Sequence, residues 1–315
     1  MDNFIFSINA TLPVFFVILV GYFLKRKEMI NENFVLVSND LNFKITLPAL
    51  LFQDIASARI KEGFDIKYVV YCMIVTSICF WGIWGCTKIW MKDKRMIGAF
   101  VQASFRGSAA VLGVAFIQTM YGNSGAAPLM IVGAVPLYNI YSVLVLTFES
   151  EDVKGRNTKN ALLNVCKNPI IISILVGLLA SYIGIYEKAP AVLTKTVSSV
   201  AGLATPLALL TIGASFEGRK AIAKIKPTLV ASFIKLILIP ALFLPFAIML
   251  GFRDQKMIAI LIMLGAPTTV SCYIMAKSMK NDGVLTSSVV VFTTLLSSIS
   301  LTGWIFILRS LGLIS

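Results

Sequence analysis

A single arginine, Arg106, stands in the middle of an apolar stretch, beside residues that disfavour a helix. Residues 104–108 read Ser-Phe-Arg-Gly-Ser, and the stretch continues through small and apolar residues to Gly113. A guanidinium group carries a permanent charge, and its planar set of donors matches a carboxylate. Because an isolated charge is costly to bury, Arg106 needs a partner. That partner is either an anionic ligand or an acid of the protein such as Asp54.

A second interruption is indicated by the sequence Gly-Ala-Pro-Thr-Thr at residues 265–269. Proline removes a backbone donor, and glycine weakens a helix. A half-helix that begins after such a break has free N–H groups and a partial positive charge, which the hydroxyls of Ser108, Thr268 and Thr269 are suited to cap. Close helix packing, or a simple kink, is the alternative explanation. The residues of the predicted anion site are Arg106, Gly107, Ser108, Gly113, Pro267, Thr268 and Thr269.

Further polar residues fall within apolar stretches. Asn139 follows Tyr138 and is expected to line the same cavity. Asp40 and Lys44 are four residues apart with the acid first, which favours mutual neutralisation on a helix. Lys235 is a candidate partner for the ligand or for an acid. Together with Asp54, these three charged residues form a predicted charge network that would serve proton coupling, and a sodium site built from unwound carbonyls is equally compatible.

The composition excludes several kinds of chemistry. The chain has no His, so His-based zinc sites and Ser-His-Asp triads are absent. Its five Cys form no C-x-x-C pair and are expected to pack as small apolar residues. We therefore expect no catalytic residues, no metal site, no cofactor and no enzyme activity. The net charge of +13 is spread over short segments between apolar runs, so no nucleic-acid partner is expected.

Membrane-spanning helices must position these residues. Hydrophobic residues make up 57% of the chain and charged residues only 14%, which is too little polar surface for a protein in water. A span needs about 20 mostly apolar residues. We predict an all-α polytopic membrane protein with ten spans. The predicted spans are 5–24, 35–57, 68–90, 97–120, 125–148, 161–183, 192–213, 228–250, 257–279 and 285–308.

The distribution of basic residues predicts the orientation of these spans. The odd-numbered loops hold 14 Lys and Arg residues and the even-numbered loops hold 6. Because basic loops stay on the cytoplasmic side, the odd loops should face the cytoplasm and both termini should face outward. The short loops suit a compact carrier in the plasma membrane.

The chain divides into two halves that resemble each other. We predict a first five-helix repeat at 1–150, a short cytoplasmic linker at 151–160 and a second repeat at 161–315. Thr-Leu-Pro-Ala-Leu-Leu at 46–51 recurs as Thr-Pro-Leu-Ala-Leu-Leu at 205–210. Five spans per half is an odd number, so the second repeat must be inverted. The interruptions then fall at matching places in helices 4 and 9, so that the positive ends of both half-helices point to the same central region, as in secondary transporters.

Three motifs resemble those of the auxin efflux carrier family, which includes bacterial malate-type permeases and plant auxin exporters. They lie at 42–52, 203–215 and 265–276. The resemblance implies ten helices, with crossed helices 4 and 9, and export of organic anions. It also implies a dimerising scaffold of helices 1, 2, 6 and 7, against which helices 3–5 and 8–10 move in an elevator-like cycle. Unlike the plant exporters, the chain has a short middle loop and no proline in its first crossing segment, between Gly107 and Gly113.

The sequence therefore predicts a secondary carrier that moves a small organic anion, such as a carboxylate, out of the cell. The bound anion, the lipid bilayer and a second copy of the chain are its expected partners. Na⁺ or H⁺ coupling is compatible with the residues present. A channel, or a membrane receptor or helper subunit that does not transport, is the alternative.

Overall fold

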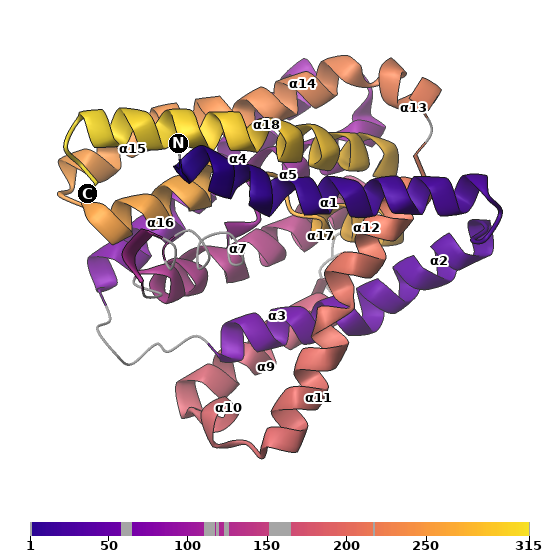
Figure 1. The fold of residues 1–315 in the computed structure, drawn as a ribbon, viewed down its shortest axis with the longest axis horizontal. Helices are drawn as coiled ribbons and strands as arrows, with labels where there is room; N and C mark the ends of the chain where they lie inside the picture. The colour runs from indigo at the N-terminus through magenta and orange to yellow at the C-terminus, as the bar shows by residue number, and fades with distance from the viewer. Residues whose placement is uncertain are drawn as a thin grey trace.

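A computed structural model describes residues 2–57, 65–109, 117, 120–122, 126–150, 165–216 and 218–314, with only the backbone described for residues 2–12 and 187. Within these ranges the chain is helical and has no β-strand (Figure 1). Six helical stretches are long and apolar enough to cross a membrane. They are Glu32–Ala56, Ile66–Trp90, Ala127–Phe148, Ala191–Ala214, Ile225–Met249 and Gly283–Ser310. The all-helical, polytopic class is thus confirmed, while the number of ten spans and the inverted repeat stay predictions.

The helices follow the order expected from the apolar runs. In the first half they are α1 (Asp2–Arg26), α2 (Glu32–Leu41), α3 (Leu47–Ala56), α4 (Ile66–Trp90), α5 (Ile97–Phe105) and α7 (Ala127–Phe148). In the second half they are α9 (Pro169–Ile183), α10 (Ile185–Lys188), α11 (Ala191–Gly202), α12 (Ala204–Ala214), α13 (Gly218–Ala223), α14 (Ile225–Phe233), α15 (Ile239–Met249), α16 (Asp254–Gly265), α17 (Ser271–Ser278) and α18 (Gly283–Ser310).

Two helices are interrupted where the sequence predicts breaks. The α5 helix ends at Phe105, and three non-helical residues separate it from Ala109. The α16 helix ends at Gly265, and α17 begins at Ser271. All residues of α5, and all residues of α16 from Met257 on, are buried. Residues 110–116, which include Gly113, lie outside the described residues, as does the predicted linker 151–160.

Two other long helices continue through a wider, π-helical turn. One lies at Asn42–Thr46 between α2 and α3, and the other at Ile234–Leu238 between α14 and α15. Each is followed by a proline at the second position of the next helix, Pro48 or Pro240. Proline cannot donate to the preceding turn, and a π-turn relieves the clash without ending the helix. Lys235 lies in the second of these turns.

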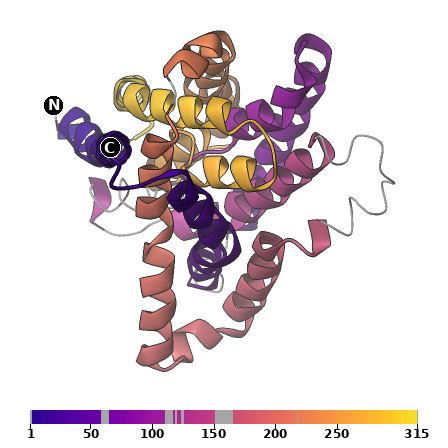
Figure 2. The same ribbon diagram turned by 90° about the vertical axis from the view of Figure 1, so that its right-hand side faces the viewer.

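The helices pack in two groups. The α1 helix runs along α12, and α3 packs against α9 and α11, which with α10 form a lobe that projects from the rest (Figures 1 and 2). The backbones of α1 and α12 approach closely, because a Cβ at Gly21 would overlap Leu210, and one at Gly213 would overlap Ile18. The second group contains α4, α5, α7 and α14–α18. The α1 helix also contacts α18 and so joins the groups.

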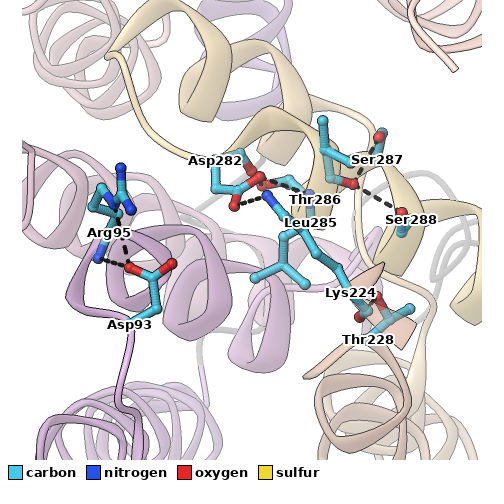
Figure 3. Close-up of polar contacts among 10 residues, drawn as sticks. Asp93, Arg95, Lys224, Thr228, Asp282, Leu285, Thr286, Ser287 and Ser288 are labelled. Atoms are coloured by element: carbon cyan, nitrogen blue, oxygen red, sulfur yellow. Dashed lines mark hydrogen bonds and ion pairs between the residues drawn. The ribbon is translucent and has the colours of Figure 1, made fainter. Parts of the chain in front are cut away.

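Polar contacts fix the ends of helices in the second group (Figure 3). Asp282 caps α18 by accepting a hydrogen bond from the backbone N–H of Leu285 at 2.9 Å, and it pairs with Lys224 at the start of α14. In the loop before α5, the backbone N–H of Arg95 donates to Asp93 and lowers the pKa of that carboxyl group. These contacts anchor helices that surround the two interruptions.

Candidate functional site at the crossing of two interrupted helices

The two interruptions meet in the interior of the second group. The backbone N–H of Ser108 donates to the carbonyl of Pro267 at 2.9 Å. The hydroxyl of Thr268 donates to the carbonyl of Ala103 at 2.7 Å, and its backbone N–H donates to the hydroxyl of Thr293 on α18 at 3.0 Å. Buried backbone groups need such partners, since unpaired ones are costly away from water. The segments therefore satisfy each other where they cross.

Gly107 lies at the tightest point of the crossing. A Cβ at this position would lie 2.9 Å from both Cε and Nζ of Lys235, and 3.1 Å from the carbonyl oxygen of Ala266. No side chain fits in this space without displacing a neighbour. A side chain here would have to displace the end of Lys235, so glycine suits the close approach of these segments.

The structure corrects the expected capping role of Thr268 and Thr269, while most of the half-helix that Ser108 was expected to cap lies outside the described residues. Helix α17 begins after Val270 and has no side-chain cap. Thr268 lies too far before the first turn, and its hydroxyl satisfies a carbonyl near the end of α5 instead. Thr269 contacts the hydroxyl of Ser271 at 3.2 Å, and Ser108 takes part through its backbone N–H. The first turn of α17 is therefore left without a side-chain acceptor.

A cavity of ≈ 330 Å³ lies beside the crossing. Its walls come from both groups of helices, namely α1, α3 and α12 on one side and the interruptions, α7, α17 and α18 on the other. The lining combines aliphatic residues with polar ones, and the polar residues come both from the breaks and from α3, α7, α12, α17 and α18. The predicted site residues that line it are Arg106, Gly107, Ser108, Pro267, Thr268, Thr269, Asn139 and Asp54.

Arg106 is a buried charged residue of the cavity wall, and the partners described for it are neutral. Its side chain is 3% exposed. Nη2 donates to Oδ1 of Asn139 at 2.6 Å, and Nη1 donates to the thioether of Met275 at 2.8 Å and to the hydroxyl of Ser142 at 3.4 Å. Among the described ion pairs, none joins Arg106 to a carboxylate. A thioether is a weak acceptor, so an anion would be a stronger partner.

Asn139 holds the guanidinium in place. Its amide Nδ2 donates to the carbonyl of Val135 one turn earlier on α7, at 2.8 Å, so its Oδ1 is turned toward Arg106. Asn139 is fully buried and lines the cavity, as the sequence predicts. Ser142 is similarly bonded to the carbonyl of Tyr138 at 2.6 Å. The α7 helix therefore supplies a fixed cradle for the arginine.

Of the predicted charge network, Asp40, Lys44 and Lys235 do not line the cavity. Asp40 and Lys44 form an exposed ion pair at 2.8 Å, which agrees with mutual neutralisation. Lys235 is fully buried, and its Nζ contacts backbone carbonyls of both interrupted helices rather than an acid. Asp54 does line the cavity with Arg106, but no ion pair between the two is described. Gly113 lies outside the described residues.

Several lining residues were not predicted. They are Thr205 on α12, Thr294 on α18 and aliphatic residues of α1 and α3. In the sequence they resemble ordinary packing residues of apolar helices. They line the cavity only because distant segments of the chain meet there. Within the described ranges, no group of three His, Cys, Asp or Glu side chains could hold a metal ion.

The fold and the cavity define an integral membrane protein whose interrupted helices meet at a buried cationic group, an arrangement typical of transporters. Comparison with known families matches residues 6–305 to the family described as membrane transport protein. The chain belongs to this family, which confirms the resemblance drawn from the three motifs. The malate-type subgroup stays a prediction.

Relatives in bacteria and archaea are also named as transporters. The chain is 29% identical to the uncharacterised transporter YfdV of Escherichia coli over 249 residues, which cover 75% of this chain and 76% of that protein. It is 22% identical to an uncharacterised transporter of Methanocaldococcus jannaschii over 310 residues, which cover 95% of this chain and 98% of the relative. A transport role is thus common to this family, and the substrate is not given by these names.

Proposed function

We propose that this transporter carries a small organic anion with one carboxylate, and that the anion binds in the cavity beside the crossing. The observation that supports this most directly is the contact of the buried Arg106 with neutral acceptors only, among the described residues. A carboxylate entering the cavity would replace the weak thioether acceptor with a charge-assisted, bidentate partner. The positive charge of Arg106 would then be neutralised by the bound anion.

The first turn of α17 supports the same proposal. Val270 and Ser271 line the cavity, and the helix start has no side-chain cap. The backbone N–H groups of Cys272 and Tyr273 donate to the carbonyls of Thr269 and Val270, so the attraction of an anion to this helix end comes from the helix dipole. An anion between Arg106 and this helix end would therefore interact with one full charge and one partial charge.

The lining favours a single negative charge on an otherwise apolar molecule. Arg106 is the one basic side chain among the described lining residues, and the carboxyl group of Asp54 also faces this cavity. A second carboxylate on the ligand would lack a cationic partner and would be repelled where Asp54 is ionised. The aliphatic side chains suit a short hydrocarbon body. We expect monocarboxylates to bind better than dicarboxylates of similar length.

An elevator-like cycle is the mechanism that we propose for transport. The cavity lies between α1, α3 and α12 on one side and the helices that carry Arg106 on the other. Movement of the second group against the first would carry the anion with its binding groups. From the distribution of basic residues, the repeated motifs and the family resemblance, we also propose export across the plasma membrane, outward-facing termini, two inverted repeats and a homodimer formed through the first group.

Transport by purified protein in proteoliposomes tests this function. We expect saturable uptake of labelled monocarboxylates with counterflow, and loss of affinity by about 10- to 100-fold in Arg106→Gln, because a charged hydrogen bond contributes about 1.5–3 kcal/mol. Asn139→Asp would place a carboxylate 2.6 Å from the guanidinium and should abolish binding without changing the cavity's size. Asn31→Asp, at the exposed cap of α2, is the matched control.

Two results would argue against the proposal. Flux that neither saturates nor shows counterflow would favour a channel. Full binding of carboxylates by Asn139→Asp would show that Arg106 does not hold the anion.

A further inference from the structure

Lys235 is a buried cation that the proposed anion site does not use. Its side chain is 0% exposed. The Nζ atom lies 2.8 Å from the carbonyl oxygen of Leu264, 3.1 Å from that of Met263 and 3.3 Å from that of Phe105. No ion pair in the described part of the chain includes this lysine. Its charge is compensated by backbone alone.

These three carbonyls belong to a particular place in the fold. Phe105 is the last residue of α5, and Met263 and Leu264 lie in the last turn of α16. The final carbonyls of a helix lack partners within the helix and carry the negative end of its dipole. The negative ends of both interrupted helices therefore converge on one point. In transporters with such helices, unwound carbonyls and helix C-termini coordinate a coupling cation.

The hydrogen bonding suits the charged form of the lysine. An ammonium group has three N–H donors, whereas a neutral amine has two and an added lone pair. Three carbonyl acceptors match the three donors of the ammonium. The end of the side chain lies against Gly107, because a Cβ at Gly107 would lie 2.9 Å from its Cε and Nζ atoms. The ammonium thus occupies the carbonyl oxygens that a bound cation would need as ligands.

We propose that the ammonium of Lys235 takes the place of a coupling cation at the crossing, so that the carrier works without Na⁺. The contacts above support occupation of the three-carbonyl site by Lys235. The consequence for ion coupling of transport rests on the proposed function. The lysine arrives with the fold, through the π-turn between α14 and α15, and need not be recruited from solution in each cycle. It stabilises the crossing permanently.

Thermal unfolding of the purified protein, with no organic anion present, tests the occupied site. We expect the Tm of the unaltered protein to be the same in sodium, potassium and choline chloride. Lys235→Ala should have a lower Tm in choline, and added Na⁺ or methylammonium should raise it in a saturable way by filling the vacated site. Lys44→Ala is the matched control, because the exposed ammonium of Lys44 contacts Asp40 and no carbonyl cluster. Its Tm should respond to none of these cations.

Saturable stabilisation of the unaltered protein by Na⁺ over choline would overturn the proposal. A folded Lys235→Ala that is indifferent to every cation would do the same. If that variant cannot be purified in folded form, Lys235→Arg and Lys235→Met decide the matter, since one keeps the charge and the other does not. The arginine variant should be the more stable, and equal stability would refute a role for the charge.

The coupling consequence has a separate readout. Proteoliposome uptake that requires Na⁺ would contradict the substitution of Na⁺ by Lys235 while leaving anion transport intact. Absence of carboxylate uptake, by contrast, would contradict the proposed function and leave the cation result in the unfolding experiment unaffected.

Discussion

Arg106 and Lys235 are both buried cations, yet their surroundings differ in kind. The ammonium of Lys235 is matched by three backbone carbonyls and lies behind Gly107, outside the cavity lining. The guanidinium of Arg106 contacts an amide, a thioether and a hydroxyl at the cavity wall. Beyond the amide of Asn139, the guanidinium has only a weak thioether acceptor and a hydroxyl at 3.4 Å, so its remaining donor capacity is suited to a ligand in the cavity. Lys235 is thus suited to stabilise the crossing, and Arg106 is suited to bind the ligand.

Gly107 provides a prediction at this scale. Gly107→Ala would place a methyl group 2.9 Å from Nζ of Lys235, and overpacking of this kind costs about 1–3 kcal/mol. We expect a lower Tm and weaker carboxylate binding, both measured on purified protein. Gly82→Ala is the control, since a Cβ at that exposed position of α4 meets nothing within 4 Å. An unchanged Tm in Gly107→Ala would mean that the crossing is looser than the structure indicates.

The sequence predicts some of these residues better than others. Arg106 and Asn139 are recognisable because a charge and an amide in an apolar stretch require a reason. The partner of Thr268 is not recognisable, because its hydroxyl bonds to Ala103, 165 residues away in the chain. The same holds for Lys235, whose acceptors are backbone atoms and leave no mark in the sequence. Contacts between side chain and distant backbone depend on the crossing geometry.

At the scale of helices, the interruptions were the most predictable feature. Glycine and proline act locally, so the ends of α5 and α16 follow from composition around Arg106 and Pro267. The π-turn at Ile234–Leu238 was not foreseen, although Pro240 is a signal that could have indicated it. The number of spans is less accessible. Interrupted helices and the 15-residue α9 are each too short to count as a span by length alone.

The contact between α4 and the start of α16 gives a pH prediction. A hydrogen bond from Lys256 at 2.6 Å lowers the pKa of Asp65, which also caps α4 by accepting from Tyr68. The unfolded carboxyl has a pKa near 3.9, so the stabilisation is complete above that value and is lost as the pH falls through the lower folded pKa. We expect the Tm to decline below about pH 4.

Asp65→Asn isolates the ion pair in this experiment, because asparagine is an equally good helix cap. The variant should have a lower Tm at neutral pH and a smaller decline in acid, both followed by thermal unfolding across the pH range. Identical pH profiles for the two proteins would assign the acid sensitivity to other carboxylates.

For the whole molecule, the question is which contacts change during transport. Two tyrosine–serine pairs have the same hydroxyl distance of 2.9 Å but different places in the fold. Ser215, at the end of α12, contacts Tyr273 on α17 and so joins the first group of helices to the second. Ser77 on α4 contacts Tyr141 on α7, inside the second group. An elevator-like cycle would break the first pair and preserve the second.

Paired cysteines joined by a short bifunctional thiol reagent test this difference. Cross-linking Ser215→Cys to Tyr273→Cys should stop turnover in proteoliposomes while carboxylate binding remains, because the two groups can no longer separate. Cross-linking Ser77→Cys to Tyr141→Cys should leave turnover unchanged. Continued transport by the first cross-linked pair would contradict movement between these groups.

The retained positive charges have a consequence for the energetics of the cycle. Arg106 and Lys235 would travel in both directions with the moving helices, so their charges cancel over one turnover, and the carboxylate alone contributes a net charge. Each cycle would then transfer one negative charge outward, and a cell interior at −100 mV would assist that transfer by about 2.3 kcal/mol. This corresponds to a concentration ratio of roughly 50-fold. The membrane voltage would thus be sufficient to drive export of the anion, and transport would be electrogenic.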